Sequence, residues 1–225
     1  MTPRRRTVLF PAMILGAIFA STPADAQSFD TASTFPVAAS REQVARCLAG
    51  YAPAEIKPDL SRLGKRAMAM TKKLVEAANA VDRIYWSQVW ERGLPLLAQV
   101  ESQDTPESRD LATLLRINYG PWNRMNENRP FLGRMEKPEG AGFYPADLSR
   151  VEWNRWLDDH PDDRNAFLSP YTVLRRTPQG LFAVPYSNAY ANDIATAAKA
   201  LREAAGLSDC QPLATFPKAR SKPVE

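Results

Sequence analysis

The sequence predicts a mainly helical α+β fold with at least one β-hairpin, and three patterns carry that prediction. Apolar residues recur at steps of three and four over residues 60–92, and again over residues 188–205, as on one face of an α-helix. Two short runs rich in β-branched and aromatic residues, 171–176 and 181–186, flank a tight turn at residues 177–180. A chain of 225 residues can form one large domain or two small ones with a core of its own.

The N-terminal segment predicts export. Three arginines precede an apolar run at residues 8–20, and an Ala-Asp-Ala string at residues 24–26 resembles a cleavage site, so residues 1–26 are expected to be a signal peptide. The apolar run has about thirteen residues, whereas a membrane-spanning helix needs about twenty, so a permanent anchor is the poorer interpretation. The mature chain is predicted to be periplasmic or secreted without a stable membrane anchor, and its export route stays open.

The charge of the chain does not predict a nucleic-acid partner. The net charge is +4, and removal of residues 1–26 lowers it to +2, so much of the basic excess belongs to the signal peptide. Cys47 and Cys210 are either partners in one long-range disulfide or two separate small buried residues, and their spacing does not decide between these alternatives.

The first half of the mature chain is expected to be helical after a linker at residues 27–39. Ser40 and Gln43 predict a capping box that opens a short helix. The helix of residues 60–92 is amphipathic and is expected to end at Gly93 and Pro95, before a third helix around residues 108–117. Its apolar stripe, expected to pack on a core, consists of Leu63, Ala67, Met70, Leu74, Ala77, Val81, Ile84 and Gln88.

The second half begins with aromatic residues among Pro, Gly and Asn, which predict loops held by turn chemistry and aromatic packing. Ser149 and Glu152 form a second predicted capping box, and the helix that they open is expected to stop at the acidic run of residues 158–163. The hairpin and a last helix that ends at Gly206 follow, and residues 208–225 are expected to be an irregular tail.

The chain offers no metal site and no catalytic residue by its pattern. His160 is the only histidine, whereas hydrolytic zinc sites need two or three close together. The acidic run around His160 has four carboxylates but lacks the glycine and the distal glutamate of a calcium loop. No Gly-x-Ser-x-Gly elbow or phosphate-binding glycine loop is present, so the predicted catalytic and metal residues are none.

The aromatic loops carry the only candidate binding residues, because they combine ring surface with amide and guanidinium donors that suit an extended peptide. The alternative, which the pattern favours, is that the rings wedge the loops onto the core and the amides satisfy turn backbones. The candidates are Asn118, Tyr119, Trp122, Asn123, Arg124, Asn126, Phe143 and Tyr144.

These loops also resemble a known family. The strings NYGPWNRMNENRPF, GAGFYPADLSRVEW, LSPYTVLRR and VPYSNAY, after the helix KKLVEAANAVDRIYW, are similar to the N-terminal portion of bacterial dipeptidyl peptidase III zinc metallopeptidases, from about Leu60 to Leu207. The resemblance implies the N-terminal lobe of a two-lobed hydrolase, here residues 40–207. It also implies a wide cleft, removal of dipeptides from peptide N-termini, and one zinc bound in the lobe that follows in sequence.

The chain departs from that family where the chemistry should lie. The family's His-Glu-x-x-x-His motif, its later Glu-rich helix and its Glu-x-Tyr string are not in this sequence, so no cofactor is expected in this chain and no site residue is carried over. The expectation is a truncated or partial exported protein that supplies part of a cleft and is inactive alone. The alternatives are a non-catalytic periplasmic peptide-binding or protein-interaction module and a non-functional fragment, and peptides are the expected ligands.

Overall fold

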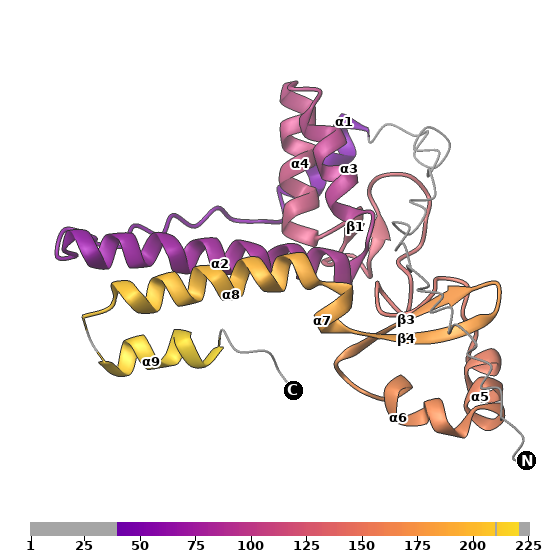
Figure 1. Ribbon diagram of the computed structural model, residues 1–225. Coiled ribbons are helices and arrows are strands. Elements are labelled where there is room, and N and C mark those ends of the chain that lie inside the picture. Colours follow the sequence, from indigo (N-terminus) through magenta and orange to yellow (C-terminus); the bar gives the residue numbers. More distant parts are fainter. Residues whose placement is uncertain (1–39, 210, 221–225) are drawn as a thin grey trace, which may run out of the picture. The chain divides into compact units, whose positions relative to one another are not determined.

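A computed structural model describes residues 40–209 and 211–220 (Figure 1). More than half of the described residues are helical, and the strands form two antiparallel pairs. The predicted mainly helical α+β class with a β-hairpin is therefore confirmed. The expected signal peptide and linker, and Cys210, lie outside the described residues, so cleavage and the pairing of Cys47 with Cys210 stay predictions.

The elements follow the order labelled in Figure 1, and their bounds are as follows. The helices of the first half are α1 (Arg41–Leu48), α2 (Lys65–Val89), α3 (Gly93–Glu101) and α4 (Pro106–Asn118). The later helices are α5 (Arg150–Asp159), the single-turn η1 (Pro161–Asp163), α6 (Arg164–Phe167), α7 (Tyr186–Ala189), α8 (Ala191–Leu207) and α9 (Gln211–Arg220). The strands are β1 (Trp122–Asn123), β2 (Arg129–Pro130), β3 (Thr172–Thr177) and β4 (Gly180–Pro185).

Both predicted capping boxes are half formed. The Ser40 hydroxyl accepts a hydrogen bond from the Gln43 amide at 3.3 Å, but the Gln43 side chain donates to the carbonyl oxygen of Pro130 instead. At α5 the Ser149 hydroxyl caps the Glu152 amide at 3.1 Å, while the Glu152 carboxylate pairs elsewhere. The helix starts are therefore confirmed, although the reciprocal half of each box serves a tertiary contact.

The long helix ends at Val89, just before Gly93 as expected, but the sequence did not predict that a new helix begins at Gly93. The chain leaves α2 at Trp90, whose backbone is extended with φ −170° and ψ 118°. Gly93 then opens α3, and Pro95 lies in its first turn, where a missing backbone N–H costs no hydrogen bond. This break turns the chain so that α3 packs beside α4.

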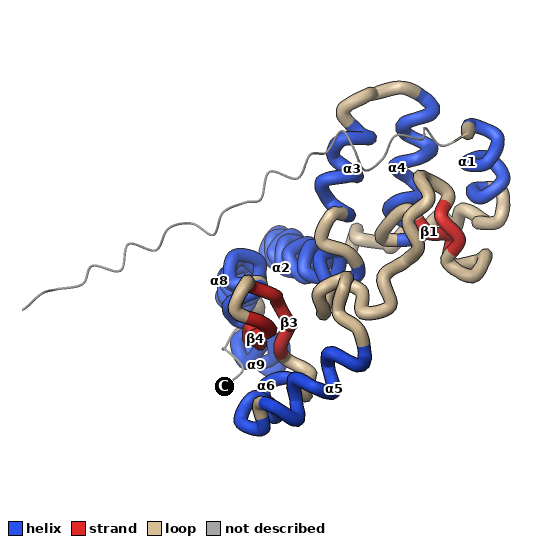
Figure 2. Tube along the Cα trace, turned by 90° about the vertical axis from the view of Figure 1, so that its right-hand side faces the viewer, coloured by secondary structure: helices blue, strands red, loops and turns tan. Residues whose placement is uncertain are grey.

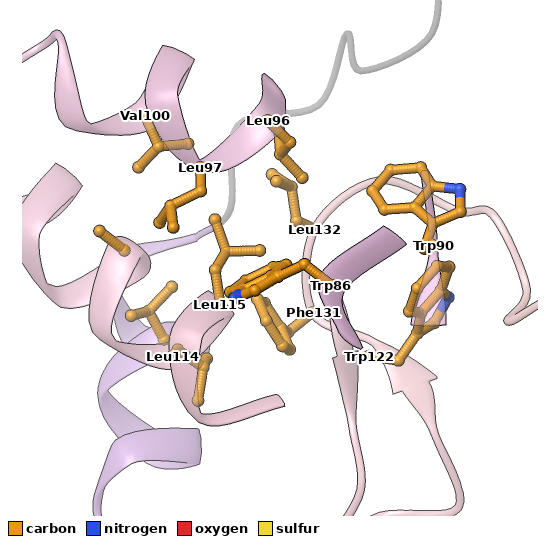
Figure 3. Close-up of a cluster of buried hydrophobic side chains, with 12 residues drawn as sticks. Trp86, Trp90, Leu96, Leu97, Val100, Leu114, Leu115, Trp122, Phe131 and Leu132 are labelled. Atoms are coloured by element: carbon orange, nitrogen blue, oxygen red, sulfur yellow. The ribbon is translucent and has the colours of Figure 1, made fainter. Parts of the chain in front are cut away.

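The largest cluster of buried side chains lies where α1, α3, α4 and the end of α2 meet (Figure 3). Leu114 and Leu115 of α4 are fully buried in it, and Leu96 faces them from α3. The rings of Trp90 and Trp122 meet edge to face, with their centroids 5.1 Å apart. The aromatic loop that begins after α4 is thus built into this core.

A second contact joins α2 to α8, which run antiparallel and lie side by side in Figures 1 and 2. Small residues, Ala77 and Ala80 facing Ala197 and Ala200, bury the contact and let the helix backbones approach closely. Arg83 pairs with Asp193 at 2.7 Å, and Lys73 pairs with Glu203 at the same distance. The antiparallel direction follows from these two pairs, since the higher-numbered residue of α2 meets the lower-numbered residue of α8.

The expected packing stripe of the long helix is only partly correct. Ala77 is buried as predicted, but Val81 is 56% exposed, and the buried side is shifted toward Ala80. The reason is that α8 approaches the helix from one edge of the stripe and leaves the other edge uncovered by any residue that the structure describes.

The predicted hairpin is confirmed as β3 and β4, which pair in the register Leu174 with Ala183 and Arg176 with Leu181. Leu174 and Leu181 face α5 and α6 and pack with Leu157 and Phe167 in a third buried cluster. The hairpin is therefore one layer of a small α/β sandwich rather than an isolated ribbon.

The end of the chain differs from the expectation. Gly206 lies inside α8 rather than after it, and Gln211–Arg220 form α9 with Pro217 within it, so these residues are not irregular. Over the described residues, none of the helices is both long and apolar enough to cross a membrane.

Candidate peptide-binding loops

Asn118 fastens the first aromatic loop to the end of α4. Its side chain is buried, and its Nδ2 donates to the carbonyl oxygen of Leu114 at 2.9 Å. Its Oδ1 accepts hydrogen bonds from the Arg124 amide at 3.1 Å and from the Tyr51 hydroxyl at 3.2 Å. These bonds satisfy a polar group that would otherwise be costly to bury, and they set the path of the loop.

Tyr119 has a left-handed backbone that its side chain holds in place. Its φ is 56°, a conformation that costs a residue with a Cβ about 1–2 kcal/mol. Its hydroxyl donates to Asp82 Oδ1 at 2.7 Å, and its ring centroid lies 4.6 Å from that of Tyr85. The hydrogen bond to the carboxylate, with burial, raises the pKa of Tyr119, so the phenol stays protonated at neutral pH.

Trp122 and Asn123 form strand β1 and face the largest buried cluster, where α1, α3, α4 and the end of α2 meet. Trp122 is 1% exposed, and its Nε1 donates to the carbonyl oxygen of Met135 at 2.8 Å. The Asn123 Nδ2 lies 3.4 Å from Cys47 Sγ, which joins the loop to α1. Both side chains therefore support the loop from its inner side.

Arg124 and Asn126 lie on the outer side of the same loop, in the connection between β1 and β2. Both are exposed, and neither side chain has a hydrogen bond or ion pair with any residue in the described part of the chain. Met125 between them is 71% exposed. This connection presents a guanidinium, an amide and an apolar side chain to solvent.

The second aromatic loop is clamped between α2 and β3 by backbone hydrogen bonds. The Gly142 amide donates to the carbonyl oxygen of Gln88 at 2.8 Å, and the Phe143 carbonyl oxygen accepts from the Leu174 amide at 2.7 Å. A Cβ at Gly142 would overlap the carbonyl oxygen of Ser87. Gly142 thus allows a close approach of two backbones, and the left-handed residue beside it is Ala141 with φ 48°.

Arg175 reinforces this clamp from β3. Its Nη1 donates to the carbonyl oxygens of Leu174 at 2.8 Å and Gly142 at 3.2 Å, and its Nη2 pairs with Glu91. No local sequence signal marks Arg175 or Glu91, because their meeting depends on how α2 and the hairpin come together.

Phe143 and Tyr144 point to different neighbours. The ring of Phe143 stacks on that of Tyr186 with a centroid distance of 6.4 Å, and burial raises the pKa of Tyr186. Tyr144 meets Trp153 edge to face at 5.7 Å and remains 41% exposed. Tyr144 is therefore the aromatic candidate with the most ring surface open to solvent.

Arg176 holds the hairpin on α5 through two carboxylates. Its guanidinium donates to both oxygens of Glu152, at 2.6 and 3.0 Å, and pairs with Asp147 at 3.1 Å. The hydrogen bonds from Arg176 hold the pKa of Glu152 below its ordinary value of 4.5.

Glu152→Gln is expected to make thermal stability less dependent on pH. A carboxylate whose pKa is lower in the folded chain adds stability above its unfolded-chain pKa and loses it as pH falls through the folded value. The variant should therefore melt below wild type at about pH 7 and together with it near about pH 3. Glu139→Gln, at an exposed carboxylate without an ion pair among the described residues, is the control, and equal melting of all three proteins at neutral pH would contradict the prediction.

The described residues do not fit a zinc ion. No group of three or more histidine, cysteine or carboxylate side chains able to hold a metal occurs among them. The ring of His160 stacks on Trp156 with a centroid distance of 3.9 Å, and its Nδ1 lies 3.1 Å from the Trp156 carbonyl oxygen. His160 thus closes the end of α5, and Asp163 of the acidic run accepts a hydrogen bond from Trp156 Nε1 at 3.1 Å.

The structure separates the candidates by exposure. The residues that support the first loop are Asn118, Tyr119, Trp122 and Asn123, and Phe143 supports the second. Arg124, Asn126 and Tyr144 are open to solvent. In the described part of the chain, no hydrogen bond, ion pair or ring contact joins the candidates of one loop to those of the other. A peptide-binding role for these residues stays a prediction.

Comparison with known proteins gives two solved structures that match most of the chain. Dipeptidyl peptidase III from Caldithrix abyssi is 36% identical with a TM-score of 0.74, covering 79% of this chain and 34% of that one. Dipeptidyl-peptidase III from Corallococcus sp. strain EGB is 32% identical with a TM-score of 0.73, covering 80% of this chain and 34% of that one.

Two further comparisons add little. A protein named Nudix hydrolase 3 from Arabidopsis thaliana is 22% identical over 209 residues, covering 70% of this chain and 27% of that protein. No family model matches the chain. The matched region is only about a quarter of the Arabidopsis protein, so the name of that protein does not indicate the activity of this chain.

The chain spans about one third of the length of the solved structures that it matches. Within that third, both the fold and the sequence agree, and this agreement confirms the resemblance drawn from the aromatic and proline strings. The chain is a partial dipeptidyl peptidase III-like protein.

Proposed function

We propose that residues 40–207 form a peptide-binding part of an exported dipeptidyl peptidase III-like protein, and that residues outside this sequence supply its zinc chemistry. The observation that carries the proposal is the match to dipeptidyl peptidase III from Caldithrix abyssi, at 36% identity over 79% of this chain. The unsuitability of the described residues for zinc supports the second part. The signal-like pattern of residues 1–26 supports export to the periplasm or the medium.

The exposed candidates are suited to hold a peptide. The Arg124 guanidinium and the Asn126 amide can donate to backbone carbonyl oxygens, and Tyr144 offers a ring held edge to face by Trp153. The buried members of the same loops fix the backbone from which these side chains project, which lowers the entropy lost on binding. The proposed division is therefore between exposed residues that touch peptide and buried residues that position them.

Substitution of the exposed candidates tests this division. Arg124→Ala and Tyr144→Ala are each expected to weaken binding of a fluorescently labelled pentapeptide library by about fivefold or more. The melting temperature should stay unchanged in Arg124→Ala and fall only slightly in Tyr144→Ala, whose ring packs on Trp153. Arg134→Ala and Tyr171→Ala, at exposed positions outside the candidate set, are the matched controls. Equal affinity for all five proteins would contradict a role for Arg124 and Tyr144 in binding.

The chemistry and the location are tested separately. The mature chain is expected not to release dipeptides from peptides, with or without added zinc, because no group of three or more possible zinc ligands occurs among its described residues. In a host that exports proteins, the chain should lose residues 1–26 and collect in the periplasm or the medium. Zinc-dependent dipeptide release by the chain alone, or retention of an unprocessed chain in the cytoplasm, would contradict the proposal.

A further inference from the structure

The connection from α1 to α2 exposes bulky aliphatic side chains. Between Leu48 and Lys65, a range that the structure describes in full, no helix or strand forms, and every residue from 52 to 66 is exposed. Ile56 is 88% exposed, and Leu60 and Leu63 are 42% and 39% exposed. A single exposed leucine is ordinary on a protein surface, but these neighbouring side chains together form a surface that gains free energy when it leaves water.

The positive charge of the mature chain is concentrated in the same stretch. Residues 55–73 hold six lysines and arginines and two carboxylates, a net charge of +4, whereas the whole mature chain carries +2. The rest of the mature chain is therefore net negative. We call residues 55–73 the basic segment.

Three cations of the basic segment are open to a ligand. Arg62, Lys65 and Lys72 are exposed, and none of them has an ion pair or a side-chain hydrogen bond with any residue that the structure describes. The cations that do pair are Lys57 with Glu55, Arg66 with Asp209, and Lys73 with Glu76 and Glu203.

The aliphatic and cationic groups adjoin where α2 begins. Leu63 and Arg62 lie directly before the helix, and Lys65 and Lys72 are seven residues apart, which places them on the same side of α2. The first turn of α2 contains no acidic residue, so the positive end of the helix dipole adds to the charge of these side chains. The carboxylate within the connection that has no ion pair among the described residues, Asp59, accepts hydrogen bonds from Ser61.

This combination fits an anionic lipid surface. A peripheral lipid-binding surface needs cations for the headgroup phosphates and aliphatic side chains that enter the interface. Nucleic-acid surfaces add aromatic rings that stack on bases, and residues 52–84 contain no phenylalanine, tyrosine or tryptophan.

We propose that the basic segment docks the mature chain reversibly on an anionic phospholipid surface. Ile56, Leu60 and Leu63 enter the interface, while the unpaired cations face the headgroup phosphates. This docking needs no membrane-spanning segment and is separate from peptide binding. It uses only the export part of the proposed function, because an exported chain meets the outer face of a membrane.

Vesicle flotation with the mature chain tests this docking. The chain is expected to bind vesicles made of equal parts of phosphatidylcholine and phosphatidylglycerol, and to bind pure phosphatidylcholine vesicles at least about tenfold more weakly. Raising sodium chloride from about 0.05 M to about 0.5 M should weaken the binding by about tenfold or more, because salt screens the attraction between the cations and the phosphates.

Two substitutions separate the charge from the aliphatic contact. Arg62→Glu should weaken binding to the mixed vesicles by about tenfold or more, and Ile56→Ser by about threefold or more. The matched controls are Arg155→Glu and Val151→Ser on α5, where both residues are exposed and Arg155 has no ion pair among the described residues. Both controls should bind as wild type does.

Each outcome decides the matter. Absence of binding to the mixed vesicles, or equal binding to pure phosphatidylcholine, would overturn the proposal, as would equal losses in the variants and their controls. Loss in Arg62→Glu without loss in Ile56→Ser would assign the basic segment to a soluble anion instead. Tighter binding to a single-stranded oligonucleotide than to the vesicles would assign it to nucleic acid.

A failure here is distinguishable from a failure of the proposed function. Vesicle binding by a chain that binds no peptide would leave the lipid surface established and remove the peptide-binding role. Peptide binding without vesicle binding would do the reverse, and retention of the unprocessed chain in the cytoplasm would remove only the export part.

Discussion

Gly142→Ala is expected to lower the free energy of unfolding by about 3 kcal/mol, near the upper range for a residue forced into a filled space. The added methyl group would overlap the carbonyl oxygen of Ser87, a backbone atom that cannot move without disturbing the end of α2. Relief would cost the hydrogen bond from the Gly142 amide to Gln88, which joins the second loop to that helix. Chemical denaturation of the mature chain measures the change.

Gly206→Ala is the matched control for this substitution. Gly206 lies in α8, and a Cβ there would meet nothing within 4 Å. The same chemical change should therefore leave the free energy of unfolding unchanged or raise it by up to about 1 kcal/mol. If the two alanines changed stability equally, the close approach of the second loop to α2 would be wrong.

Trp122→Ala is expected to lower the free energy of unfolding by about 3–5 kcal/mol, the range for truncating a large buried ring. The ring is 1% exposed, packs against Trp90, and donates to the carbonyl oxygen of Met135. Its removal would leave a cavity in the core and would remove the hydrogen-bond donor of the partly buried Met135 carbonyl group. Denaturant unfolding followed by circular dichroism gives the change without relying on tryptophan fluorescence.

Tyr144→Ala provides the comparison that separates support from binding. Because Tyr144 is 41% exposed, its truncation should cost far less stability than that of Trp122, and its effect should fall on peptide affinity. A Trp122→Ala protein that kept wild-type stability and lost peptide binding would reverse the roles assigned to these two rings.

The parts of the fold that depend on short sequence signals could be predicted. Ser40 and Ser149 mark helix starts because a hydroxyl at the N-cap satisfies an amide two or three residues on, whatever the tertiary structure. The hairpin follows from two β-rich runs around Gly180, which has φ 131°. Gly93 and Pro95 did not predict helix α3, because both residue types occur at the end and at the start of a helix. The extended backbone at Trp90 is what separates α2 from α3.

The packing of the helices and the candidate site depend on contacts between residues far apart in the sequence, which no local pattern predicts. The long helix has an apolar stripe wider than α8 can cover, so its periodicity could not say that Ala80 is buried and Val81 is not. The residue types of the aromatic loops suit both peptide binding and packing of the loops on the core. Only the contacts of Asn118 and Trp122 with the core, and their absence for Arg124 among the described residues, divide the candidates.

Isothermal titration of the mature chain with a pentapeptide, in excess chelator and again in excess zinc, tests most directly the claim that this chain is a peptide-binding part without zinc chemistry of its own. The prediction is saturable binding with the same Kd in both conditions, by a chain that unfolds cooperatively. No heat with any peptide, or binding that appears only when zinc is added, would contradict it.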